Sequence, residues 1–282
     1  MPNEVEKRMG YIQKVFLGVQ DYMQKNRDPH ELIIFLDSEP PEFRSVAYES
    51  ASMEIGLKDL LQGRQLNEWM KFCSLSKEKH SFHLEIGLGW AFAKAEIAPS
   101  PYLELLAPPM QWMVFDGIGY YYGLFKGRRT VKNHQVPETI NGEQLHGFDQ
   151  GLGRRLWYIC KGEVNGLVQF IQSFPSPRHP DLWRGAGIAC GYVGGSEKTN
   201  LELLVAHSAG FKQQLCTGVA LAALSRNLSD TVTRDIELAC EIICGIPLQE
   251  VLRAEAGVSE KIDFKSGHFY IHWMTQLEEK FS

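Results

Sequence analysis

No apolar run in this sequence is long enough to cross a lipid bilayer, which takes about 20 residues. The longest candidate, residues 86–98, is interrupted by Lys94 and Glu96. The first residues also lack the basic region and apolar block of a secretory signal peptide, because charged side chains such as Glu4 and Glu6 stand there instead. We therefore expect a cytoplasmic protein with no membrane partner.

The familiar motifs of catalytic and cofactor sites are also missing. There is no Walker A loop, no G-x-S-x-G nucleophile motif and no C-x-x-C pair among the six cysteines. The G-x-G pairs that do occur lack the third glycine and the following acidic residue of a dinucleotide fingerprint. The sequence thus predicts no metal site and identifies no cofactor.

Positive charge is scarce as well. The formal net charge is −5, and the only basic cluster is a short patch from Lys126 to Lys132. A protein that binds nucleic acid usually presents a broad basic face, so we expect no nucleic-acid partner.

The sequence does contain a pair of small residues, separated by one position, that recurs six times. The copies begin at Ser50, Gly87, Gly117, Gly151, Gly185 and Gly218. Their first members stand 37, 30, 34, 34 and 33 residues apart. A period in the low thirties is typical of a two-helix unit stacked on copies of itself.

Apolar residues flank each pair at helical spacing, which predicts a helix around it. Glycine inside a helix costs about 1 kcal/mol relative to alanine, and close packing of neighbouring helices would compensate for this cost. Shorter apolar segments lie between these helices and predict the second helix of each unit. Examples are residues 66–75, 102–106, 164–174 and 201–206.

We therefore predict an all-α fold, an α-solenoid-like stack of about six helical hairpins of about 34 residues. An irregular helical domain with a decayed duplication is the alternative. The stack would form a single domain over residues 1–282. In it, residues 1–40 form an N-terminal cap that includes an amphipathic helix, residues 41–228 the repeat core and residues 229–282 a C-terminal cap.

Polar residues precede the small pairs by one or two positions, and equivalent positions of stacked units line up along one face. These residues are Glu49, Glu85, Asp116, Asp149, Gln150 and Arg184. Together with Arg154, which follows one pair by a turn, they predict a groove of carboxylates and arginines. The candidate catalytic residues are Glu85, Asp116, Asp149, Arg154 and Arg184. Alternatively, these residues pair across helices or face water.

Aromatic residues gather around the third, fourth and fifth units. A concave surface lined by aromatic rings suits a flat, apolar or polyene ligand. The candidate ligand-binding residues are Tyr120, Tyr121, Trp157 and Trp183. Alternatively, these side chains belong to the hydrophobic core.

Four strings of sequence resemble a known family. They occupy residues 87–91, 115–119, 148–157 and 181–187. Together they are similar to the UnbL-type family of bacterial proteins, a family of unknown function encoded in enediyne polyketide biosynthetic gene clusters. The resemblance covers about residues 43–245. It implies a cytoplasmic accessory protein in making an enediyne or polyene polyketide, and it assigns no catalytic residue.

Three functions remain open at this point. In the first, the protein is an accessory factor that holds a polyketide intermediate or docks other biosynthetic enzymes. Alternatively, it is a metal-dependent or acid–base enzyme that modifies the polyene chain, or a general protein-interaction repeat protein. The sequence does not decide whether the protein is an enzyme, and it leaves assembly into a homo-oligomer open.

Overall fold

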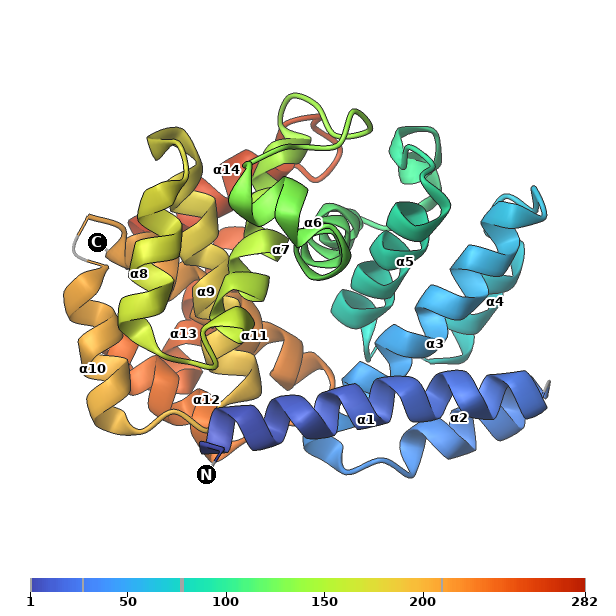
Figure 1. The fold of residues 1–282 in the computed structure, drawn as a ribbon, viewed down its shortest axis with the longest axis horizontal. Helices are drawn as coiled ribbons and strands as arrows, with labels where there is room; N and C mark the ends of the chain where they lie inside the picture. The colour runs from blue at the N-terminus through green and yellow to red at the C-terminus, as the bar shows by residue number, and fades with distance from the viewer. Residues whose placement is uncertain (1, 27, 77–78, 209, 282) are drawn as a thin grey trace.

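The computed structural model describes residues 2–26, 28–76, 79–208 and 210–281. This part of the chain is built from helices and contains no strand, which confirms the all-α prediction (Figure 1). Each of the six small-residue pairs lies inside a helix. These helices are α3 (Pro41–Leu61), α5 (Ser81–Ala95), α6 (Met113–Phe125), α7 (Gln144–Ile159), α9 (His179–Val193) and α11 (Lys212–Leu228).

The six helices pack in chain order, each against the one before and the one after it. The contact is made through the small residues, as α7 shows. A Cβ atom on Gly151 would overlap the carbonyl oxygen of Asp116 in α6, and one on Gly153 would overlap that of Leu182 in α9. Each pair thus lets one helix touch the backbones of both neighbours, which is the compensation expected for glycine inside a helix.

The first copy uses serine in place of glycine and keeps the same neighbours. Ser52 donates a hydrogen bond to the carbonyl oxygen of Leu84 in α5, at the position that the second glycine of a pair meets elsewhere. Ser50 donates to the carbonyl oxygen of Phe16 in α1 (Glu4–Lys25) at 2.8 Å. Helix α1 therefore takes the place of a preceding unit beside α3.

Only four of the six helices are preceded by a second α-helix. The outer helices are α2 (Pro29–Asp37), α4 (Asn67–Leu75), α8 (Val164–Ser173) and α10 (Lys198–His207). Before α6, the segment predicted as a helix over residues 102–106 is instead a 3₁₀ helix, η1 (Ser100–Leu105), followed by a second 3₁₀ turn, η2 (Met110–Trp112). Prolines around this segment lack the N–H that an α-helix needs. Before α7 stands a short π-helix, η3 (Arg128–Lys132). The prediction of about six hairpins is thus wrong for the third and fourth units.

The series of helices curves until its last member meets its first. Arg226 of α11 donates from Nη1 to the carbonyl oxygen of Glu42 in α3 at 2.7 Å. Its other terminal nitrogen donates to the carbonyl oxygen of Tyr192 at 2.5 Å, and its guanidinium carbon lies 3.9 Å from the centre of the Tyr192 ring. The inner faces of the six helices consequently turn toward a common centre.

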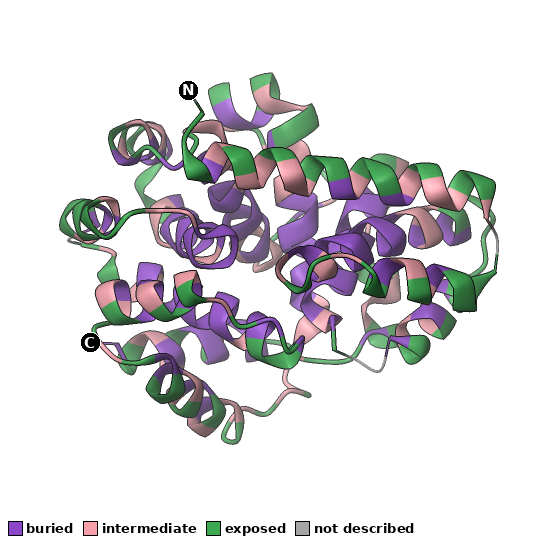
Figure 2. Cartoon of the chain, turned by 90° about the horizontal axis from the view of Figure 1, so that it is seen from below, coloured by how far each residue is buried: buried purple, intermediate pink, exposed green. Residues whose placement is uncertain are grey.

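Helix α1 lies across this centre. It packs mainly on α3 and also reaches α9, where Arg8 Nη1 donates to the carbonyl oxygen of Val193 at 3.0 Å. Figure 2 shows α1 running over the helices beneath it, with exposed residues on its outer side. The amphipathic helix predicted near the N-terminus is present as α1, and it contacts both α3 and α9.

The chain ends in helices that cover the later units. They are α12 (Arg234–Ala239), the π-helix η5 (Cys240–Cys244), α13 (Leu248–Ser259) and α14 (Phe269–Glu279). Helices α13 and α14 pack on α11. From α14, Tyr270 reaches back along the array, stacks on Trp112 with ring centres 4.8 Å apart, and donates to Gln150 Oε1 at 2.7 Å.

The close approach of the helices predicts opposite effects for two glycine-to-alanine substitutions. Gly153→Ala should lower the free energy of unfolding by about 2 kcal/mol or more, because the new methyl group overlaps the backbone of α9. Gly18→Ala in α1, where a Cβ meets no atom within 4 Å, should raise it by up to about 1 kcal/mol. Urea denaturation of both variants measures the difference. A Gly153→Ala protein as stable as wild type would contradict backbone contact at this position.

Candidate functional site

A cavity of about 940 Å³ lies at the centre of the helical series, beneath α1. Six of its lining residues occupy one repeat position, three residues after the first small residue of each copy. They are Met53, Trp90, Tyr120, Arg154, Ile188 and Leu221. All six inner helices therefore contribute the same register position to one cavity.

Four residues further along, the last five of these helices contribute again. The lining residues at this position are Lys94, Leu124, Tyr158, Tyr192 and Ser225. Residues four apart lie on one face of an α-helix. Because the helices touch at their small residues, one face of each helix is directed inward, and the repeat itself builds the cavity wall.

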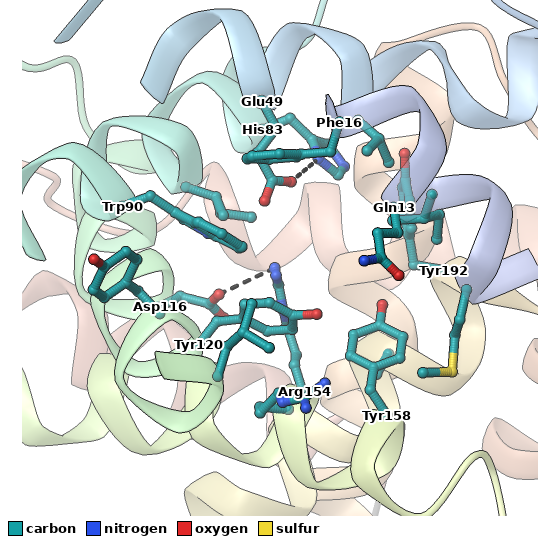
Figure 3. A pocket seen from close by; sticks show the side chains of 18 of the residues that line it. Gln13, Phe16, Glu49, His83, Trp90, Asp116, Tyr120, Arg154, Tyr158 and Tyr192 are labelled. Carbon is teal, nitrogen blue, oxygen red and sulfur yellow. Dashed lines mark hydrogen bonds and ion pairs between the residues drawn. The ribbon is translucent and has the colours of Figure 1, made fainter. Parts of the chain in front are cut away.

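Aromatic rings form much of this wall. The Trp90 ring lies 5.3 Å from that of Tyr120 and 4.9 Å from that of Phe16 in α1, measured between ring centres. Tyr120 in turn meets Tyr158 edge-on at 5.5 Å. Tyr121 also lines the cavity, 5.8 Å from Trp90. These rings surround an interior into which several of them project (Figure 3).

A carboxylate–imidazole pair borders the cavity between α3 and α5. Glu49 Oε2 lies 2.7 Å from His83 Nδ1, and both side chains are buried (Figure 3). Burial lowers the pKa of His83, although the bond to Glu49 opposes this shift. The ring is therefore neutral near pH 7, and we assign its proton to Nδ1, the nitrogen that faces the Glu49 carboxyl group.

A buried ion pair also borders the cavity, between α6 and α7. Arg154 Nη1 lies 3.0 Å from Asp116 Oδ1, and Gln150 Nε2 donates to Asp116 Oδ2 at 2.9 Å. Burial raises the pKa of Asp116, while the charge of Arg154 opposes that shift. The Arg154 guanidinium also lies 5.1 Å from the centre of the Tyr120 ring. Of the five predicted catalytic residues, Asp116 and Arg154 are thus brought together at the cavity.

The structure places Asp149 and Arg184 outside the cavity lining. Asp149 forms a buried ion pair with Arg178, whose Nε donates to Asp149 Oδ2 at 2.8 Å. Burial raises the pKa of Asp149 to about 6 against the opposing charge of Arg178. Arg184 forms ion pairs with Asp181 and with Glu278 of α14. Both Asp149 and Arg184 therefore follow the alternative interpretation, in which the polar residues pair across helices.

Glu85 is also absent from the cavity lining. Its carboxyl group is buried, its Oε2 atom has no hydrogen-bond partner, and burial raises its pKa to about 8. Burial raises the pKa of the Cys73 thiol in α4, and Glu85, once ionised, adds to this shift, so Glu85 lies toward that outer helix. The five candidate catalytic residues therefore do not share a single groove.

Of the four aromatic candidates, two line the cavity and two do not. Tyr120 and Tyr121 line the cavity, whereas Trp157 and Trp183 are buried and take no part in its wall. Residues of α1, such as Gln13 and Phe16, were not predicted, because α1 carries no copy of the repeat. Tyr192 was also missed, although its place one helical turn beyond Ile188 would have identified it.

Among the described residues, no group of three or more His, Cys, Asp or Glu side chains is arranged to hold a metal ion. Within the same part of the chain, no helix combines the length and apolarity needed to span a membrane.

Burial of Glu85 predicts a specific dependence of stability on pH. Well below pH 4.5, the folded and the unfolded chain both hold the proton. Between about pH 4.5 and about pH 8, the unfolded chain releases a proton that the folded chain retains, so the free energy of unfolding should fall as pH rises. Glu85→Gln should remove this loss and exceed wild-type stability at pH 8 by on the order of a few kcal/mol.

Denaturation at pH 4.5 and at pH 8 measures the effect, with the exposed Glu104→Gln as the matched control. The control should keep the wild-type profile. Identical profiles for wild type and Glu85→Gln would contradict a neutral, buried carboxyl group at this position.

Comparison with known proteins identifies the family of this chain. No curated protein and no solved structure matches the chain significantly. The model of one protein family matches residues 1–281. Because this match extends over nearly the whole chain, the protein belongs to the family described as Protein of unknown function (DUF1702).

Proposed function

We propose that this protein binds an elongated, largely apolar small molecule of polyene type in its central cavity. In this proposal it acts as an accessory protein in enediyne or polyene polyketide biosynthesis. The observation that carries the proposal is the cavity wall, to which all six inner helices contribute the same repeat position. A wall built by the whole repeat is a property of the fold and not a gap left between two elements.

The size and chemistry of the cavity support a ligand of this kind. Ligand pockets measure roughly 300–1,000 Å³ and are lined mainly by apolar and aromatic side chains with a few polar groups. At about 940 Å³, this cavity has room for a long chain. Flat conjugated segments stack well on rings such as Trp90 and Tyr120. Exposed apolar side chains of Leu17, Leu124 and Phe125 border the cavity and provide an apolar entrance.

The biosynthetic role rests on the resemblance to the UnbL-type family. The family match is consistent with that resemblance because both concern proteins of unknown function. The ligand would then be a polyketide intermediate, and the enzymes that supply or consume it would be the protein partners.

A second candidate function is acid–base catalysis on the bound chain, and the Glu49–His83 pair favours it. With its Nδ1 proton directed to Glu49, His83 has the Nε2 lone pair free to accept a proton from a ligand O–H or C–H group. Glu49 would hold the ring and stabilise the imidazolium that forms. His83→Gln should then retain the ligand and lose turnover, whereas a pure carrier would be unaffected in both respects.

Two glycines of α1 allow a matched test of ligand binding. Gly10 borders the cavity and Gly18 does not, and a Cβ on either residue meets no atom within 4 Å. Gly10→Trp should obstruct the cavity and weaken binding of cis-parinaric acid, a conjugated tetraene, by about tenfold or more, as expected if over 1.4 kcal/mol of contacts is lost. Gly18→Trp should bind as wild type does. The rise in polyene fluorescence on transfer from water into the cavity measures both.

Absence of a saturable fluorescence rise with the wild-type protein would contradict the proposed function. Equal weakening by both tryptophans would show that the probe binds elsewhere on α1.

A further inference from the structure

The charged residues of the cavity are unequally matched. Three carboxylates line it, and each has a partner there. Glu6 pairs with Lys161 at 2.7 Å, Glu49 binds His83, and Asp116 pairs with Arg154. The carboxyl groups of Glu6 and Asp116 thus each face a positively charged side chain, whereas that of Glu49 bonds to the neutral ring of His83.

Arg155 is a cavity-lining cation without such a match. The side-chain partner recorded for its guanidinium group is the neutral phenol of Tyr120, and its Nε atom is buried with no hydrogen-bond partner. Its aliphatic stem passes over Gly123 of α6, where an added Cβ would come within 2.9 Å of Cγ. The packing therefore fixes the stem, and the guanidinium is available for an anion brought by a ligand.

The phenol of Tyr120 interacts with this arginine, and the Tyr158 ring lies 5.5 Å from that of Tyr120, measured between ring centres. Figure 3 shows the hydroxyl groups of Tyr120 and Tyr158 directed into the cavity. Burial raises the pKa of Tyr120, even though the charges of Arg155 and Arg154 oppose this shift, so the phenol stays protonated near pH 7. Burial raises the pKa of Tyr158 as well. A neutral phenol can donate its proton in a hydrogen bond to an oxyanion.

We propose that the ligand of the cavity is amphipathic and carries an oxyanion, a carboxylate or a phosphate, which binds Arg155 together with the hydroxyl groups of Tyr120 and Tyr158. The apolar chain then extends along the aromatic wall formed by Trp90 and Phe16. This inference rests on the proposed function, because it specifies the head group of the molecule that the cavity binds.

Arg155 can be replaced without stranding a buried charge. Removing Arg154 would leave Asp116 without its counter-charge, which destabilises the fold and confuses a binding measurement. Arg155→Met keeps an apolar stem over Gly123 and removes only the charge and its donors. Lys94→Met is the matched control, because Lys94 also lines the cavity and its nearest carboxylate, Glu54, lies outside the lining.

The experiment compares cis-parinaric acid with its methyl ester by fluorescence titration of wild type, Arg155→Met and Lys94→Met. We expect wild type to bind the acid about tenfold or more tightly than the ester, as charge-assisted bonds to one arginine allow. Arg155→Met should bind the acid as weakly as the ester, and Lys94→Met should keep the wild-type preference. Thermal unfolding checks that each variant is folded. If Arg155→Met unfolds, Arg155→Gln replaces it.

Competition against bound probe identifies the oxyanion. Palmitate, hexadecyl phosphate and hexadecanol present the same chain with a carboxylate, a phosphate or no charge. The better competitor of the first two indicates the head group, and hexadecanol should be the weakest of the three.

The outcomes separate the two proposals. Equal binding of acid and ester by wild type, equal competition by hexadecanol, or an acid preference that survives in Arg155→Met would overturn the head-group inference and leave chain binding intact. Failure of both the acid and the ester to bind wild type would overturn the proposed function and this inference together.

Discussion

Backbone contact between successive helices is the constraint on which the rest of this structure depends. Small residues at two positions of each inner helix let it approach the carbonyl groups of both neighbours, as Gly151 and Gly153 do in α7. Because side chains at these positions would overlap backbone atoms, the helices can pack in only one register. Ser52 meets the same requirement with a hydroxyl group that bonds to the neighbouring carbonyl oxygen.

That register determines what the cavity contains. Residues three and seven positions after the first small residue share one helical face. The first of these positions lines the cavity in every unit, and the second does so in all units but the first. The fold thus repeats a packing motif while varying the inward residues, from Trp90 to Arg154 to Leu221. A wall of this kind combines rings, apolar chains and a few charges. This variation of the inward residues on a fixed framework explains the proposed binding of an amphipathic chain.

The sequence predicted the six inner helices and their close packing, because the spacing of small residues is a local signal. The prediction of the site failed where the position of a residue depended on the direction of its side chain around the helix or on contacts with segments distant in the sequence. Glu85 and Asp149 precede their pairs by two residues and Asp116 by one, and one residue turns a helix by about 100°, so the first two face away from the cavity. Arg184 is paired by Glu278 of α14, a contact that no repeat pattern contains. The residues that α1 contributes to the cavity could not be predicted either, because α1 carries no copy of the repeat.

The central claim, that the cavity holds a small molecule, is tested most directly by native mass spectrometry of the protein purified from its own cells. The account predicts a complex heavier than the bare chain by the mass of one small molecule. That molecule should leave on denaturation and absorb light as a conjugated chain does. A bare chain, or a chain bound only to another protein, would contradict the account and assign the aromatic residues of the cavity to packing alone.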